Sequence, residues 1–332
     1  MKSYFKLFLQ VAMLLAVTAC APSIVQTPTT APPATPAGSS LRAVFEGTTA
    51  CSSQTRPLPQ IPEDTDCELT IWKIMFYQDS ATGMSTTYTL ESTYGPSQPN
   101  SLGPAGGGTP ISMEGTWSIV KGTMADPDAD VYQLHSEDSQ VAVSFVKMSN
   151  DILHVLNRDK TLMLGNAAWS YTLNRTDNRP PLDMDGPVSS GPEVTRPPIP
   201  TMPSGSSVLG VYEGRTPCHE VVFEMLKLTP YPNCLKIKSR LTLYQDQATG
   251  APSAYMLMGT STIQEGTWTL LQGTKDDPGA VVYQIRLDDS QEPVSFLKAD
   301  DNHLFLLDQD LNLVVGNGLF SYTLSRIEER AQ

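Results

Sequence analysis

The chain has little positive charge. Its 332 residues carry 22 Lys and Arg against 35 Asp and Glu, which gives a formal net charge of −13. Nucleic-acid binding needs a basic surface that neutralises phosphates, so this balance argues against a nucleic-acid partner. An acidic chain can instead attract cations or basic partners, or it can present a solvated surface that aids solubility.

The N-terminus has no segment long enough to span a membrane comfortably, but it carries a targeting signal. Its apolar run, residues 7–17, follows two lysines and leads to Val-Thr-Ala-Cys at Cys20, the order of a bacterial lipobox. We predict that residues 1–19 are a signal peptide, that Cys20 is lipidated, and that residues 20–41 are a flexible tether. The lipid would then anchor the protein in the cell envelope. Because no Asp follows Cys20, we expect the outer membrane.

The rest of the chain contains one domain twice. The matching segments are 44–47 and 211–214, 77–79 and 244–246, 114–117 and 265–268, and 170–173 and 321–324. A proline-rich stretch separates the two copies and is expected to be extended. We predict a first domain over residues 42–176, a linker over 177–207 and a second domain over 208–328, each of an ordinary domain size.

Within each copy the pattern is that of β-strands. From Cys234 to Leu243, apolar and polar side chains alternate, which is typical of a strand with one buried face. Further short alternating segments follow, separated by Gly, Pro and Asp turns. No stretch shows an amphipathic helix of ten or more residues. The sequence therefore predicts an all-β protein, with each copy forming a meandering antiparallel barrel or sandwich.

Several motifs resemble the N-terminal domain of the NlpE lipoproteins, a family tied to copper resistance and envelope stress. They are Tyr212-Glu213-Gly214, Pro217-Cys218, Gly266-Thr267-Trp268, residues 306–310 and Tyr322-Thr323-Leu324. The resemblance implies two tandem small antiparallel lipocalin-like β-barrels in an outer-membrane lipoprotein, with a role in surface sensing, copper tolerance or envelope stress signalling and an envelope protein as partner. The family spaces its two cysteines as Cys-x-x-Cys, whereas here a longer segment separates them.

The cysteine count points to two disulfides. Without the lipidated Cys20, four cysteines remain, two per copy with the same spacing: Cys51 and Cys67, Cys218 and Cys234. In an oxidising envelope this pattern indicates two bridges, each worth roughly 3 kcal/mol for a loop of about 15 residues. The alternative is a thiol site for a soft metal such as Cu(I), or a redox sensor.

Copper is the one cofactor that the resemblance suggests. The candidate ligands lie in the second copy: Cys218, His219, Cys234, Met256 and Met258. A copper site built from the fold should occur in both copies, yet no His or Met is shared. For example, His154 aligns with Phe305 and His303 with Ile152. No nucleophile with a His partner recurs either, so we predict a protein without enzymatic activity.

The second strand of the first copy has an unusual outer face. Leu69, Ile71 and Met75 stand where the second copy has Lys236, Lys238 and Thr242. We expect this apolar stripe to be exposed and to dock on the second barrel or on a partner protein, unless the alignment is displaced by one residue.

The leading functional hypothesis is a non-enzymatic envelope lipoprotein that senses surface contact or envelope stress. One alternative is a lipocalin-like carrier of a small apolar ligand, which requires an unfilled barrel interior. Another is an inhibitor of an extracellular hydrolase. An inhibitor requires a protruding loop, for which the candidates are the insertion from Tyr94 to Pro110 and the segments between the paired cysteines.

Overall fold

The computed structural model describes residues 35–327, apart from residues 53–54, 99–101, 137–138, 181–199, 219, 227–233, 260–261, 276 and 287–292. The predicted signal peptide, the lipidation site Cys20 and the central part of the predicted linker lie outside the described residues. Within these residues, no helix has the length and apolar character needed to cross a bilayer.

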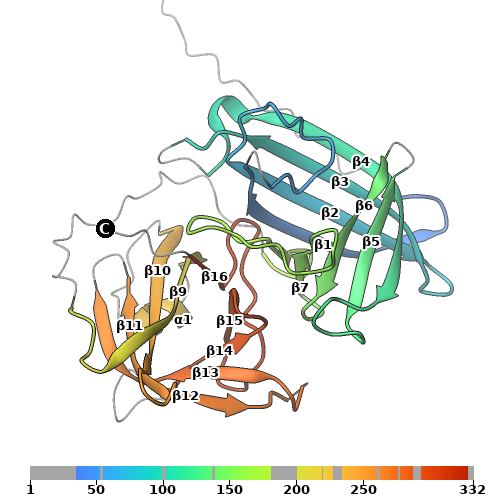
Figure 1. Cartoon of the computed structure of the whole chain (residues 1–332). Helices are drawn as coiled ribbons and strands as arrows, with labels where there is room; N and C mark the ends of the chain where they lie inside the picture. Colours follow the sequence, from blue (N-terminus) through green and yellow to red (C-terminus); the bar gives the residue numbers. More distant parts are fainter. Residues whose placement is uncertain are drawn as a thin grey trace, which may run out of the picture. The chain divides into compact units, whose positions relative to one another are not determined.

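The structure confirms the all-β prediction with two closed antiparallel barrels of eight strands each (Figure 1). The first consists of β1 (Ser39–Ala50), β2 (Leu69–Asp79), β3 (Ser85–Gly95), β4 (Thr109–Lys121), β5 (Asp130–Ser136), β6 (Ser139–Lys147), β7 (Ile152–Val155) and β8 (Thr172–Arg175). The second consists of β9 (Ser206–Pro217), β10 (Lys236–Asp246), β11 (Pro252–Met258), β12 (Ile263–Gln272), β13 (Val281–Ile285), β14 (Val294–Lys298), β15 (His303–Leu307) and β16 (Thr323–Arg326).

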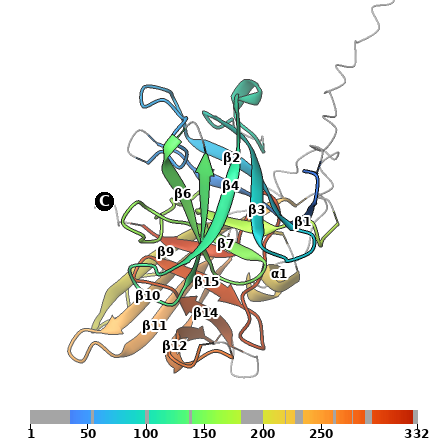
Figure 2. The ribbon, with the colours of Figure 1, turned by 90° about the vertical axis from the view of Figure 1, so that its right-hand side faces the viewer.

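Each barrel is a simple meander. Every strand pairs with the next along the chain, as Figure 2 shows for β2, β3 and β4, and the last strand pairs with the first. The first barrel begins at Ser39, inside the stretch that we expected to belong to the tether. Closure of each sheet on itself leaves neither barrel with an open edge strand, which protects it from edge-to-edge aggregation.

Side chains fill both barrel interiors. In the first barrel, Trp72, Ile74 and Phe76 point inward from β2 as the alternation predicts, and each is at most 1% exposed. The ring of Phe76 lies 4.9 Å from that of Trp117 in an edge-to-face contact. Leu241, Leu243 and further large side chains fill the second barrel in the same way. A core packed with aromatic rings stabilises the barrel by apolar burial and ring contacts.

Two of the repeated motifs hold each other in place inside the barrels. The Trp117 indole N–H donates to the backbone carbonyl of Tyr77 at 2.7 Å, and the Trp268 indole donates to that of Tyr244 at 2.6 Å. In both copies this hydrogen bond gives the buried indole N–H group the partner that it needs.

The repeated Glu-Gly pair in the first strand of each copy allows the barrel to close. A Cβ atom on Gly47 would lie 2.7 Å from Leu173 Cδ2 and 2.8 Å from the Thr172 carbonyl oxygen. A Cβ atom on Gly214 would lie 2.6 Å from the Thr323 carbonyl oxygen. Glycine is therefore required where the first strand approaches the last one.

We expect Gly47→Ala and Gly214→Ala to lower the free energy of unfolding by about 1–3 kcal/mol each, because the closing strands must separate to admit a methyl group. Gly103→Ala is the matched control, since its new methyl group would meet only Ile71 Cδ1 at 3.8 Å. Guanidinium denaturation measures all three. Equal stability of the three variants would show that the close approach does not matter.

The structure confirms both predicted disulfides, Cys51–Cys67 and Cys218–Cys234, each with a sequence separation of 16. In the first barrel, the segment between the two cysteines places Leu58 and Ile61 in the core cluster with exposures of 0% and 3%. In the second, the segment forms the short helix α1 (Glu220–Leu226), and its Val222 is fully buried in that core. We call these two segments the plugs, because each disulfide holds apolar side chains of the segment in the core of its barrel.

The predicted apolar stripe is not exposed, which corrects our expectation. Leu69 and Met75 are 2% and 5% exposed, and Ile71 is half-buried. The insertion after β3 lies beside the stripe, since Leu69 pairs with Gly95 and a Cβ atom on Gly103 would lie 3.8 Å from Ile71. The first barrel's own insertion therefore packs beside Ile71, a contact for which the second copy has no equivalent segment.

Candidate functional site: the junction between the barrels

The two barrels belong to one compact unit and meet at equivalent positions of the repeat. The hydroxyl groups of Ser170 and Ser321 lie 2.8 Å apart, and those of Thr172 and Thr323 lie 2.9 Å apart. Each pair is separated by 151 positions, which is the offset between the two copies in this region. A contact in which a surface meets its own equivalent is isologous, the arrangement found in symmetric dimers. We call this contact the junction.

Further hydrogen bonds cross the junction. The Asn174 side chain, 1% exposed, donates to the Asn317 carbonyl at 2.9 Å and accepts from the Gly316 N–H at 2.8 Å. Arg179 donates to the carbonyl groups of Val315 and Gly316, both at 3.1 Å. The end of the first barrel is therefore fastened to the loop that precedes β16. The buried amide of Asn174, with its partners satisfied, fixes one relative position of the two surfaces, and the exposed Arg179 adds to it at the rim.

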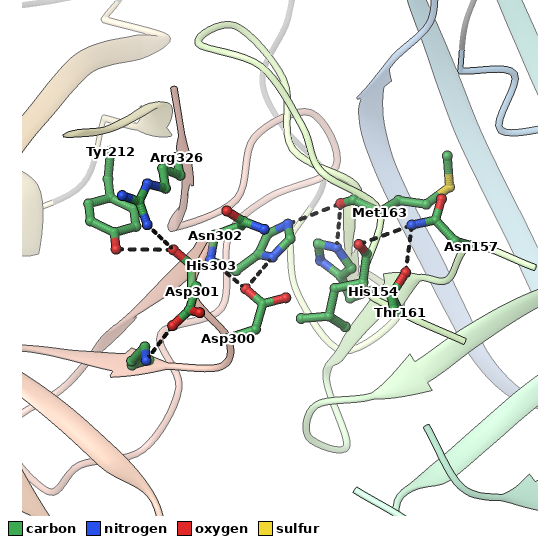
Figure 3. Close-up of polar contacts among 12 residues, drawn as sticks. His154, Asn157, Thr161, Met163, Tyr212, Asp300, Asp301, Asn302, His303 and Arg326 are labelled. Carbon is green, nitrogen blue, oxygen red and sulfur yellow. Dashed lines mark hydrogen bonds and ion pairs between the residues drawn. The ribbon is translucent and has the colours of Figure 1, made fainter. Parts of the chain in front are cut away.

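At the centre of the junction, two histidines face each other (Figure 3). His154 comes from β7 and His303 from β15, and both are fully buried. Their ring centroids lie 5.0 Å apart in an edge-to-face arrangement. Both Nε2 atoms point at one acceptor, the backbone carbonyl of Met163, at 3.0 Å from His154 and 3.1 Å from His303. One carbonyl of the first barrel thus binds a ring from each barrel.

His154 is neutral in this environment. Burial lowers the pKa of its imidazole to about 3, and the nearby His303 adds to the effect. Since Nε2 faces a carbonyl, it carries the proton, and Nδ1 accepts a hydrogen bond from the Thr172 hydroxyl at 3.0 Å. This tautomer is assigned from its hydrogen-bond partners.

His303 has acceptors on both sides. Its Nδ1 lies 2.8 Å from the Asp300 carboxylate, and its Nε2 faces the Met163 carbonyl. Burial raises the pKa of the Asp300 carboxyl, but hydrogen bonds from His303 and from backbone N–H groups outweigh it and leave the pKa lowered. Asp300 is therefore an anion at neutral pH. Each ring nitrogen of His303 therefore faces an oxygen acceptor, and the ring is held between Asp300 of its own barrel and Met163 of the other.

The segment that carries Asp300 is tied to the second barrel. The backbone carbonyl of Asp301 accepts hydrogen bonds from the Tyr212 hydroxyl at 3.2 Å and from Arg326 at 3.4 Å. Burial raises the pKa of Tyr212 to about 12, so its hydroxyl stays protonated and can donate. The Asp301 side chain pairs with Lys298 at 2.6 Å. These contacts hold Asp300 in position beside His303 (Figure 3).

The predicted metal ligands are not available as a thiolate set. Cys218 and Cys234 are joined in a disulfide, and His219 lies outside the described residues. Along β11, Tyr255 and Leu257 point into the core. Met256 and Met258 alternate with them and therefore lie on the outer face of the strand. In the part of the chain that the structure describes, no three His, Cys, Asp or Glu side chains are grouped to hold a metal ion.

One further histidine lies beside a hydroxyl. His135 Nε2 is 3.0 Å from Ser118 Oγ, on neighbouring strands of the first barrel. The pair is exposed, and among the described residues no carboxylate is recorded in contact with the ring. A nucleophile needs a base that a third group orients, so this pair is a cross-strand surface contact.

The sequence alone did not identify the junction. His154 and His303 align with apolar residues of the other copy, so they were set aside as unshared. Their signal was nevertheless present: residues 152 and 154 of one copy match residues 303 and 305 of the other, and each copy has one His in that pair. The isologous contact brings these two positions of the repeat, and with them the two unshared histidines, together.

The search against known proteins adds nothing to these motifs. No family model, no curated protein and no solved structure matches the chain. The resemblance to the NlpE lipoproteins therefore rests on the motifs quoted above.

Proposed function

We propose that this protein is a lipid-anchored, non-enzymatic lipoprotein of the outer membrane that senses the state of the envelope, and that the junction is its responsive element. The observation that carries the proposal is the buried pair of His154 and His303, whose rings face each other at the contact between two separately closed barrels. Histidine is the side chain whose charge changes most readily near physiological pH.

A sensor needs two states that its signal favours unequally. Protonation of His154 would place a positive charge inside a buried contact, with its ring centroid 5.0 Å from that of His303. Burial of this charge, and next to it the electrostatic effect of His303, disfavour the closed junction. The barrels themselves are expected to stay closed, because the strand pairing and the disulfide of each barrel lie within that barrel. Acidification of the envelope would therefore separate two stable bodies that a linker keeps together.

The filled interiors favour this proposal over a carrier. Aromatic and aliphatic side chains occupy both barrels, and the plugs add to the same cores. A lipocalin-like carrier needs open volume in that position. The plugs are also the segments between the paired cysteines that we considered as inhibitory loops. Their side chains Leu58, Ile61 and Val222 are buried in the cores, which does not fit a protruding loop.

The test compares the transcript profile of the native bacterium before and after an acid shift, in cells with the wild-type chain, His154→Gln or Cys20→Ser. The proposal expects a set of transcripts that responds in wild-type cells and fails to respond in both variants. His135→Gln, which alters an exposed histidine, should respond like the wild type. An identical response in all four strains would contradict the sensing role.

A role in copper tolerance is part of the same proposal and rests on the resemblance. Thiolate binding of Cu(I) requires a disulfide to open, because the thiolate is the ligand form. We expect non-reducing peptide mapping of the mature protein from its own envelope to find Cys51–Cys67 and Cys218–Cys234 fully bridged, with and without added copper. A bridge that opens with copper would move the sensing element from the junction to the plugs.

A further inference from the structure

A small cavity lies inside the junction, apart from the histidines. Its volume is about 10 Å³, room for about one water-sized guest. It is lined by Thr48, Trp169, Ser170, Arg215, Phe320 and Ser321, together with three neighbouring residues. Residues from both barrels therefore enclose it, and it exists only while the junction is closed.

Two polar groups of this lining have no partner. Thr48 is 5% exposed, and its hydroxyl oxygen makes no hydrogen bond. The Nε atom of Arg215 is likewise buried and unpaired. Buried polar groups without partners cost free energy, and each one calls for an explanation, such as a bound ion or water. Both groups can donate a hydrogen bond, and both line the same cavity.

The cavity also has an excess of positive charge. Arg215 stacks on Trp169, with its guanidinium carbon 5.0 Å from the ring centroid, and no salt bridge to it is recorded among the described residues. Lys236 is close by: burial lowers the pKa of its amine, and the charges of Arg215 and Lys238 lower it further. Burial lowers the pKa of Arg215 as well. Arg215 is only half-buried, but its Nε atom is buried without a partner, so a counter-ion at this position would stabilise the junction.

The repeat explains why one cation is found here. Thr48 and Arg215 occupy equivalent positions, one residue after the closing glycine of each copy, so the isologous contact brings them to one cavity. An arginine in both copies would place two cations there. The pair of one arginine and one threonine supplies a single positive charge and an additional hydroxyl donor.

We propose that this cavity binds a small monoatomic anion, such as chloride, between the Arg215 Nε–H group and the Thr48 hydroxyl. The Ser170 and Ser321 hydroxyls supply a third donor, because they share one hydrogen between them and the second hydrogen is free to point into the cavity. A polyatomic oxyanion such as phosphate exceeds the volume. The bound anion joins groups from both barrels, so its binding and the closure of the junction stabilise each other.

The direct test uses crystals of the mature chain grown in bromide, which has the charge of chloride and an anomalous signal. We expect an anomalous peak in the cavity of the wild-type protein. The isosteric variant Thr48→Val and the variant Arg215→Gln should weaken or abolish it. A cavity of the wild-type protein without a peak, filled by water or by nothing, would overturn the assignment.

A solution measurement covers the case in which Arg215→Gln does not fold. Thermal unfolding of the mature chain is followed while chloride replaces gluconate at constant ionic strength. Above the dissociation constant, the Tm should rise by roughly 3 °C for each tenfold increase in chloride. Thr48→Val should lose this dependence, whereas Arg42→Gln, which alters an arginine stacked on Trp117 away from the junction, should keep it. Equal chloride dependence in Thr48→Val and wild type would also overturn the site.

Discussion

Lowering the pH from 7 to 4 is expected to weaken the junction steeply, by roughly 1.4 kcal/mol for each pH unit below about pH 6 through His154 alone. The folded pKa of His154 is lowered to about 3, below the usual value of 6.5. The neutral ring is therefore favoured in the closed junction, and the separated or unfolded state binds the proton. Stability is present above pH 6.5 and is lost as the pH falls from there to about 3.

The groups that face His154 support this direction. His303, paired with Asp300, lies on the second barrel, while the Met163 carbonyl and the Thr172 hydroxyl lie on the first. Among these groups, Asp300 is the carboxylate, and it is already paired with His303. Carboxylates elsewhere in the described part of the chain, whose pKa values are lowered, lose their contribution to stability only at a lower pH.

Comparison of the wild type with His154→Gln isolates this group. Glutamine keeps an amide donor for the Met163 carbonyl but does not titrate, so its stability should depend less on pH between 6 and 4. His135→Gln removes an exposed histidine and should keep the wild-type slope. Denaturant unfolding at a series of pH values measures the three slopes. Parallel slopes for the wild type and His154→Gln would show that His154 is not the group that titrates.

The second large effect is a loss of stability, expected from a substitution in the loop between Cys51 and Cys67. Replacement of Leu58 by Ala should lower the free energy of unfolding of the first barrel by about 2–5 kcal/mol, the range for a large side chain removed from a protein core. Leu58 lies between Cys51 and Cys67, outside any strand, yet it is fully buried in the core cluster. The cavity that the variant leaves would be enclosed by the plug and the barrel.

A surface leucine provides the control for this experiment. Leu41 is 46% exposed on β1, and Leu41→Ala should change stability by less than about 1 kcal/mol. Guanidinium unfolding of both variants gives the difference. Should Leu58→Ala be as stable as Leu41→Ala, the segment between the cysteines would be an ordinary surface loop and the barrel interior would be accessible at that end.

Much of the fold could be predicted because the chain contains two copies of the same domain, so each pattern can be compared between them. The alternation in the strand after Cys234 fixed the inward face, and the equivalent residues Trp72, Ile74 and Phe76 line the first barrel. The equal cysteine spacing predicted both disulfides. Barrel closure was beyond the pattern, since alternation cannot distinguish a barrel from a sandwich. The resemblance supplied that distinction, and the glycines at positions 47 and 214 show its physical basis.

The plugs and the junction could not be predicted from the sequence, and the reason is the same for both. Both depend on contacts between segments that differ in the two copies, whereas the repeat pattern shows only the residues that the copies share. Leu58 lies in a proline-rich loop, and Val222 lies in a helix shorter than a recognisable amphipathic pattern. The expectation that the stripe is exposed was wrong for the same reason: the insertion, which only the first copy has, lies next to Leu69 and Ile71.

The measurement that tests the account most directly is the distance between the two barrels as a function of pH. Spin labels on Met84→Cys and Leu270→Cys, both more than half exposed, report it in a chain with Cys20→Ser, because the other cysteines are bridged. We predict one narrow distance distribution at pH 7, longer and broader distances at pH 4, and a narrow distribution at both pH values for His154→Gln. A wild-type distribution that stays narrow at pH 4 would contradict the junction as the responsive element.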